Sequence, residues 1–151
     1  MKTILITGGA NGLGKGVALH YLSKGNRVIA VSNSAASGES FLNEAKQYEA
    51  EERAVFIKAD LSLINENKRI IEKISEIFPT LDLLIFCASK HRKNYSETAE
   101  GLESSFALDY LSRFLLSYGL KECLEKTAMA VLFSETKLGG NFELRSFELR
   151  A

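Results

Sequence analysis

The sequence has little that would cross-link the chain, break its helices or give it a charge of one sign. It contains two cysteines, two histidines, one proline and no tryptophan, and its 19 basic residues balance 19 acidic ones. This neutrality gives no reason to expect nucleic acid or an anionic membrane as a partner. No apolar run approaches the roughly 18 residues that a bilayer span needs.

These absences favour a cytoplasmic protein. The N-terminal stretch MKTILITGG reaches its glycines too early to act as a secretion signal. Cys87 and Cys123 lie far apart in unrelated contexts, so we expect both to be reduced and buried. The spacing of histidine, cysteine and carboxylate residues does not predict a metal site.

With 151 residues, 46% of them apolar, the chain is large enough for one domain with a real core. Short apolar runs alternate with segments of helical periodicity. The predicted strands are residues 4–6, 27–31, 54–57, 83–87 and 128–133, and the predicted helices are 13–23, 37–48, 65–78 and 101–124. This alternation predicts an α/β fold, a Rossmann-type doubly wound parallel sheet in the order 3-2-1-4-5 with helices on both faces.

The segment TGGANGLGKG lies between the first predicted strand and the first predicted helix. Gly8 can form the tight turn, Gly12 allows a pyrophosphate to approach the backbone, and Gly14 allows the helix to pack closely on the strand. The helix N-terminus that follows favours an anion. The alternative is a glycine-rich turn without a ligand.

Five motifs in order along residues 1–136 resemble the short-chain dehydrogenase/reductases, and in particular the retinol-dehydrogenase-like branch. They are TGGANGLG, Asp60-Leu61 after the third strand, LLIFCAS after the fourth, TAEGLESSFALDYLSRFLLS in the long helix, and AVLFSE in the fifth strand. The resemblance implies an oxidoreductase of alcohols or carbonyls. The resemblance also implies a set of cofactor-binding residues, to which we add Ser32 and Asn33 at the polar end of the second strand. The full set is Thr7, Gly8, Asn11, Gly12, Leu13, Gly14, Ser32, Asn33, Asp60, Leu61, Ala88 and Ser89.

The end of the second strand bears on the choice of cofactor. NAD-binding relatives carry a carboxylate there that bonds the ribose 2′-hydroxyl. Here the segment reads VSNSAAS, and Ser32 and Asn33 could donate hydrogen bonds to a 2′-phosphate, although no Arg or Lys stands beside them. We therefore expect NADP(H), with NAD(H) as the alternative.

The family's catalytic tyrosine, followed by a lysine four residues later, is missing. The residues four positions after the five tyrosines are Gly25, Glu52, Ala99, Phe114 and Glu122. Phe147 and Ala151 stand where the family has its Tyr and Lys, and the family's helix asparagine is Asp109. A hypothetical acid/base site would draw on His91, Tyr95, Asp109 and Ser134; the alternative is that the loop around His91 is a solvated surface.

The losses leave three explanations open: a shortened member with another role, an enzyme that uses other groups, or a fragment or frameshifted product. Residues 1–138 are predicted to form the dinucleotide-binding domain and 139–151 an atypical tail with a repeated FELR. That tail could add to a sheet edge, swap between subunits or fray.

The protein is either a reductase of an unknown small molecule or a nucleotide-binding member without catalysis. The family's long helix pairs subunits, so we expect a homo-oligomer through residues 101–124.

Overall fold

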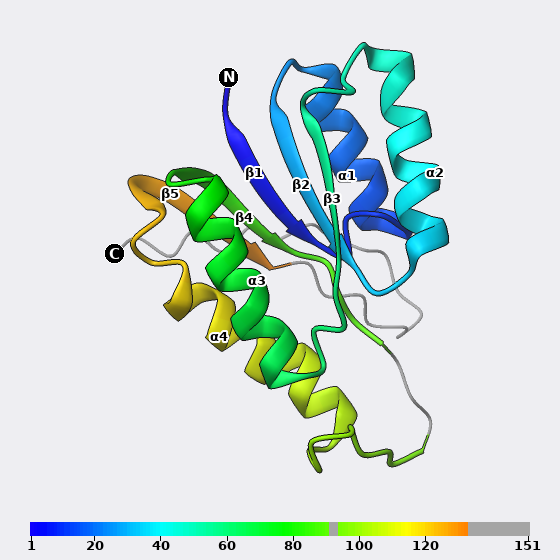
Figure 1. Cartoon of the computed structure of the whole chain (residues 1–151), viewed down its shortest axis with the longest axis vertical. Coiled ribbons are helices and arrows are strands. Elements are labelled where there is room, and N and C mark those ends of the chain that lie inside the picture. The colour runs from blue at the N-terminus through cyan, green and yellow to red at the C-terminus, as the bar shows by residue number, and fades with distance from the viewer. Residues whose placement is uncertain (91–93, 133–151) are drawn as a thin grey trace, which may run out of the picture.

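The computed structural model describes residues 1–90 and 94–132, and for residues 125–132 it describes the backbone alone. The strands form a sheet in the order β3-β2-β1-β4-β5, and each neighbouring pair is parallel (Figure 1). The predicted fold class and strand order are therefore confirmed. The strands are β1 (Thr3–Thr7), β2 (Arg27–Ser32), β3 (Ala54–Lys58), β4 (Leu81–Phe86) and β5 (Leu124–Leu132). The predicted tail lies outside the described residues.

In the described part of the chain, four α-helices cover the two faces of the sheet in pairs. They are α1 (Gly12–Ser23) and α2 (Ala35–Ala45) on one face, and α3 (Ile64–Ile77) and α4 (Ser112–Gly119) on the other (Figure 1). Successive side chains of a strand point to opposite faces. In β1, Ile4 and Ile6 accordingly enter the core under α1 and α2, while Leu5 enters the core under α3 and α4. Since the central strand is buried on both faces, its sequence is a continuous apolar run.

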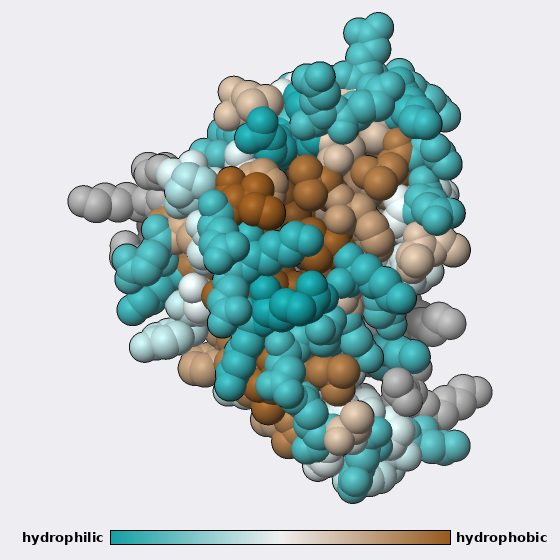
Figure 2. Space-filling view, viewed as in Figure 1, coloured by the Kyte–Doolittle hydropathy of each residue, from teal (hydrophilic) through white to brown (hydrophobic). Residues whose placement is uncertain are grey.

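Hydrophilic residues cover much of the face that carries α3, and hydrophobic residues reach the surface there in small groups (Figure 2). Among the described residues, no helix has the length and apolar character needed to span a bilayer. Cys87 and Cys123 are both free thiols. Cys123 is buried as expected, whereas Cys87 is only half-buried, because it lies at a cavity described below.

The predicted helix at 101–124 is shorter than expected. The chain is helical from 104 to 119, and its first part is the π-helical segment η2 (Phe106–Leu111). Glu103 delays the start, because its carboxylate accepts hydrogen bonds from the backbone N–H groups of Ser105 and Phe106. The helix ends before Leu124, which pairs with Leu81 as β5 begins. The prediction was wrong at both ends, since these contacts compete with helical hydrogen bonds.

The aromatic stripe of this helix faces outward. Phe106, Tyr110, Phe114 and Tyr118 are between 48% and 65% exposed. They stack in two pairs, with ring centroids 5.4 Å apart for Phe106–Tyr110 and 6.1 Å apart for Phe114–Tyr118. The buried side of the helix instead carries small and aliphatic residues: Ala107, Ser112 and Leu116.

Candidate functional site

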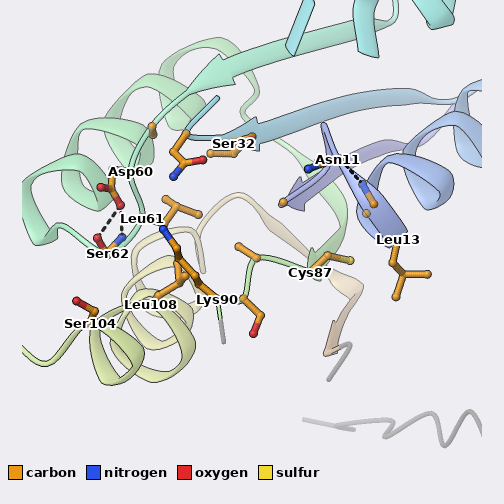
Figure 3. Close-up of a pocket in the computed structure, with 18 residues that line it drawn as sticks. Asn11, Leu13, Ser32, Asp60, Leu61, Ser62, Cys87, Lys90, Ser104 and Leu108 are labelled. Atoms are coloured by element: carbon orange, nitrogen blue, oxygen red, sulfur yellow. Dashed lines mark hydrogen bonds between the residues drawn. The ribbon is translucent and has the colours of Figure 1, made fainter. Parts of the chain in front are cut away.

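A cavity of about 430 Å³ opens at the carboxyl ends of the parallel strands, where ligands of such sheets bind. Asp60, Leu61 and Ser62 lie on one side of it and Asn11 and Leu13 on the other (Figure 3). The lining residues come from the end of β2, from loops that follow four strands, and from the long helix. They are Gly8, Asn11, Gly12, Leu13, Gly14, Val31, Ser32, Asn33, Ala59, Asp60, Leu61, Ser62, Cys87, Ala88, Ser89, Lys90, Ser104 and Leu108.

At two glycines of the loop, Gly8 and Gly14, close backbone contacts leave no room for a side chain. Gly8 has φ +69°, and a Cβ there would lie 2.8 Å from the backbone nitrogen of Ala88. A Cβ on Gly14 would lie 2.2 Å from the carbonyl oxygen of Gly8. Gly12 has φ +51°, but a Cβ on it would meet nothing within 4 Å. Gly8 and Gly14 thus fix the turn, while Gly12 leaves its backbone open toward the cavity.

Helix α1 begins at this loop. The Asn11 side chain accepts a hydrogen bond from the Gly12 N–H at 2.8 Å, and the Asn11 carbonyl accepts one from the Lys15 N–H at 3.1 Å. The N–H groups of Leu13 and Gly14 precede the first residue that can bond within the helix. Together with the helix dipole they form a site that favours negative charge. The cavity side of the loop therefore suits a phosphate.

The ends of β2 and β3 form a polar wall. Ser32 and Asn33 follow the last buried residues of β2, and Asp60 follows β3. The Asp60 carboxylate accepts hydrogen bonds from the Ser62 N–H at 3.0 Å and from the Ser62 hydroxyl at 2.6 Å. Leu61 is buried beside it and gives the wall an apolar surface. An apolar surface flanked by polar groups suits a heteroaromatic base next to a sugar.

The end of β4 closes the cavity from below in Figure 3. Thr7 is buried and does not line the cavity, although we predicted it as a binding residue. Its hydroxyl accepts a hydrogen bond from the Ala88 N–H at 3.3 Å, and its carbonyl accepts one from the Cys87 N–H at 3.0 Å. Thr7 therefore positions the residues that do reach the cavity.

Cys87 is the half-buried thiol at this end of the cavity. Burial raises its pKa from 9.0 to about 11, and the nearby Arg113 guanidinium opposes this shift. The thiol is therefore neutral at physiological pH, which makes it a poor nucleophile. Nη2 of the Arg113 guanidinium lies 3.5 Å from the Ala88 carbonyl oxygen and 3.6 Å from Oδ1 of Asp109.

Of the residues predicted for acid/base chemistry, the two that the structure describes, Asp109 and Tyr95, do not line this cavity. Asp109 lies in η2, does not line the cavity, and has one carboxylate oxygen that is buried without a hydrogen-bond partner. Tyr95 is exposed and donates a hydrogen bond to Glu97 at 2.7 Å, which is the main reason why the pKa of its hydroxyl is raised. His91 and Ser134 lie outside the described residues.

Seven lining residues escaped the sequence analysis as ligand contacts: Val31, Ala59, Ser62, Cys87, Lys90, Ser104 and Leu108. Ser104 and Leu108 reach the cavity from the start of the long helix, and Lys90 reaches it from the end of β4. The spacing of Ser104 and Leu108, four residues apart on a helix, is compatible with one face, but nothing local shows which face turns to the sheet. Within the part of the chain that the structure describes, no group of three His, Cys, Asp or Glu side chains could hold a metal ion.

A scan of protein families matches residues 2–132 to the model described as short chain dehydrogenase. Among curated proteins, the chain is 31% identical over 129 residues to retinol dehydrogenase 12 from Mus musculus, and the match covers 85% of this chain and 41% of that protein. It is 30% identical over 148 residues to a WW domain-containing oxidoreductase from Drosophila melanogaster, covering 96% of this chain and 36% of that protein. The chain thus spans less than half the length of either relative.

Solved structures share the fold. A mutant short-chain dehydrogenase/reductase from Serratia marcescens superposes with a TM-score of 0.72 at 20% identity, covering 87% of this chain and 54% of that one. The Pseudomonas aeruginosa RhlG/NADP active-site complex superposes with a TM-score of 0.69 at 23% identity, covering 92% of this chain and 58% of that one.

Proposed function

Because the chain belongs to the short-chain dehydrogenase family, whose members bind NAD or NADP, we propose that it binds a nicotinamide dinucleotide in the cavity. The observation that carries the proposal is the glycine cradle. Gly8 and Gly14 touch backbone, and Gly12 leaves the start of α1 open at the cavity wall. The pyrophosphate would lie at Gly12–Gly14, and the adenosine between Ser32–Asn33 and Asp60–Leu61.

The end of β2 favours NADP(H) over NAD(H). The cavity residues there are Ser32 and Asn33, both neutral hydrogen-bond donors. A carboxylate in this place would bond a 2′-hydroxyl and repel a 2′-phosphate. Since neither residue carries a negative charge, the site accepts the phosphorylated ribose.

The first candidate function is reduction or oxidation of a small alcohol or carbonyl compound with this cofactor. The dinucleotide would supply or accept the hydride. The chain's own residues would bind the dinucleotide, and Ala88 and Ser89 would border its ribose. Asp109, His91, Tyr95 and Ser134 remain the candidate acid/base groups of this reaction.

A second candidate is dinucleotide binding without turnover by this chain. It is favoured by the absence of any tyrosine followed by lysine at the fourth position in the 151 residues. The positions of Asp109 and Tyr95 away from the cavity lining also favour it. In this case the nucleotide is a ligand that stabilises the fold or an interaction with a partner.

Calorimetric titration with NADPH and NADH tests the binding proposal. The matched pair Gly12→Asp and Gly12→Asn isolates charge, because both side chains tolerate a positive φ and have the same shape. A carboxylate beside the pyrophosphate weakens binding by at least ~10-fold relative to the amide at low salt. If wild-type protein of the correct intact mass binds neither dinucleotide, the proposal is wrong.

Turnover separates the two candidate functions. NADPH oxidation is followed with a panel of aldehydes and ketones, for wild type and for the double substitution Phe147→Tyr with Ala151→Lys. Turnover by wild type supports the reductase. Turnover confined to the double variant, with binding present in both proteins, supports the second candidate.

We also propose that the protein forms a homo-oligomer and acts in the cytoplasm. The exposed stripe of Phe106, Tyr110, Phe114 and Tyr118 is an apolar surface on a helix, and association would cover it. Its free thiols fit a reducing compartment. Light scattering should give a mass near twice 16.7 kDa; a mass of one chain would contradict the oligomer. Fractionation with a cytosolic marker checks the compartment.

A further inference from the structure

The cavity holds two charged side chains among its lining residues, Asp60 and Lys90. The Asp60 carboxylate is engaged by the N–H and the hydroxyl of Ser62. Lys90 forms no ion pair with any residue that the structure describes. Its ammonium is therefore the cation available to a ligand from the described part of the cavity wall.

Lys90 lies in the segment after β4, whereas the neutral donors Ser32 and Asn33 lie at the end of β2. It follows Ser89 beyond the end of β4, and its side chain runs toward Leu61 and Ser62 (Figure 3). This places the ammonium on the adenosine side of the cavity, opposite the side that carries Asn11 and Leu13. The order of the sheet explains the approach, because β1 alone separates β4 from β2.

The charge balance at this side of the cavity needs such a cation. A 2′-phosphate brings up to two negative charges, whereas Ser32 and Asn33 offer only neutral donors and Asp60 adds a negative charge. A flexible lysine supplies a point charge that can reach a phosphate without a fixed geometry. A charge-assisted hydrogen bond is roughly twice as strong as one between neutral groups.

We propose that Lys90 recognises the 2′-phosphate of the adenosine ribose and thereby makes the chain select the phosphorylated dinucleotide. This inference rests on the proposed function, because it deepens the same site. It assigns the specificity to a residue after β4, while Ser32 and Asn33 serve as neutral hydrogen-bond donors to the same phosphate.

The test compares Lys90→Gln with Lys73→Gln, which removes the same charge from the exposed face of α3. Calorimetry with NADPH and NADH is run on both variants and on wild type. We expect Lys90→Gln to weaken NADPH binding by about 10- to 100-fold and to change NADH binding less than about threefold. Lys73→Gln should leave both affinities unchanged, and Lys90→Arg should retain most of the NADPH preference.

Competition with 2′,5′-ADP and with 5′-ADP locates the contact. If Lys90 binds the 2′-phosphate, Lys90→Gln weakens 2′,5′-ADP and spares 5′-ADP. Equal weakening of both ligands would assign Lys90 to the 5′-phosphates and overturn the inference, while the proposed function would stand. No change in any affinity would overturn it as well. Circular dichroism checks that each variant is folded.

Discussion

Two regions border the cavity, and they are held in place by different means. The first, residues 8–14 with the ends of β2 and β3, is held by backbone contacts: the Gly8 N–H donates to the Val31 carbonyl at 2.7 Å, and the Ala59 N–H donates to the Ser32 carbonyl at 2.9 Å. The second, residues 94–113, has backbone hydrogen bonds within itself, such as that from the Ser104 N–H to the Ser96 carbonyl at 2.8 Å, but side chains tie it to α3. The Glu100 carboxylate accepts hydrogen bonds from the N–H groups of Ile64 and Asn65 at the start of α3.

This difference indicates which amino-acid substitutions each region tolerates. The first region depends on chain geometry, so most of its side chains can vary while its packed glycines cannot. The second region depends on particular polar side chains, so single substitutions there can shift it against the sheet. We therefore expect ligand binding to depend mainly on the first region, and any chemistry on the exact placement of the second.

The largest effect is expected at Gly14. In Gly14→Ala the new Cβ would lie 2.2 Å from a backbone oxygen that cannot move without opening the turn. The free energy of unfolding should fall by about 3 kcal/mol, and dinucleotide binding should be lost. Urea denaturation measures the first and calorimetry the second.

Gly16→Ala is the matched control, since a Cβ there meets nothing within 4 Å and alanine favours a helix interior by about 0.5–1 kcal/mol. Equal stability of the two alanine variants would show that the close contact between Gly14 and the Gly8 carbonyl does not hold the turn.

The next effect concerns Cys87, which lies between the two regions. With its pKa raised to about 11, its thiolate fraction at pH 8 is about 100-fold below that of a thiol with pKa 9. Alkylation by iodoacetamide should be slow at pH 8 and should keep rising toward pH 11. Peptide mapping by mass spectrometry resolves Cys87 from Cys123, and protein unfolded in urea provides the control.

The same shift sets the sign of a stability change. The unfolded chain releases this proton at a lower pH than the folded chain, so folding stability falls as the pH rises from 9.0 to about 11. Cys87→Ala should make that decline shallower. A labelling profile that levels off near pH 9 would show that the thiol is not buried as described.

A smaller effect is expected from the buried hydrogen bonds that tie the two regions together. The Asn67 amide donates to the carbonyls of Leu61 and Leu63, each at 2.8 Å, and accepts from the Ser112 hydroxyl at 2.8 Å. Asn67→Ala leaves these groups unpaired and should cost about 2 kcal/mol. Asn65→Ala, on the exposed side of α3, is the control and should stay within about 0.5 kcal/mol of wild type.

A double-mutant cycle with Ser112→Ala measures the coupling between the regions. If the tie acts as described, the double variant is more stable than the sum of the two single effects predicts. Strict additivity would mean that the two regions are held independently.

The smallest effect is expected for Tyr95→Phe. The substitution removes one exposed hydrogen bond to Glu97 and should change stability by less than about 0.5 kcal/mol. Dinucleotide affinity should not change, because Tyr95 does not line the cavity. If the wild type has reductase activity, a large loss of kcat in this variant would instead place Tyr95 at the reacting atoms.

Much of the first region could be predicted from the sequence. The apolar runs that became β1 to β4, the glycines between β1 and α1, and the polar ends of β2 and β3 are all local signals. Once the parallel strand order follows from the alternation of strands and helices, these ends must meet at one edge. The strand order and fold class were confirmed for this reason.

The second region could not be predicted to the same extent. The periodicity of residues 101–124 gave a helix, but its ends were displaced by the Glu103 carboxylate and by the pairing of Leu124 with Leu81. Phe106, Tyr110, Phe114 and Tyr118 follow one another at intervals of four residues and so share one side of a helix, but this spacing does not say whether that side faces the core or the surface. The smaller residues Ala107, Ser112 and Leu116 fit against the sheet and α3, and the aromatic rings turned outward.

The sequence by itself therefore determined the fold class, the glycine turn and the polar ends of β2 and β3, because each of these follows from local signals along the chain. Only the tertiary structure decided that Lys90 joins Ser32 and Asp60 in one cavity, and that Asp109 and Tyr95 stay outside its lining. The physical reason is that these placements depend on which side of a helix or loop packs against a distant strand, and packing is a property of the assembled sheet.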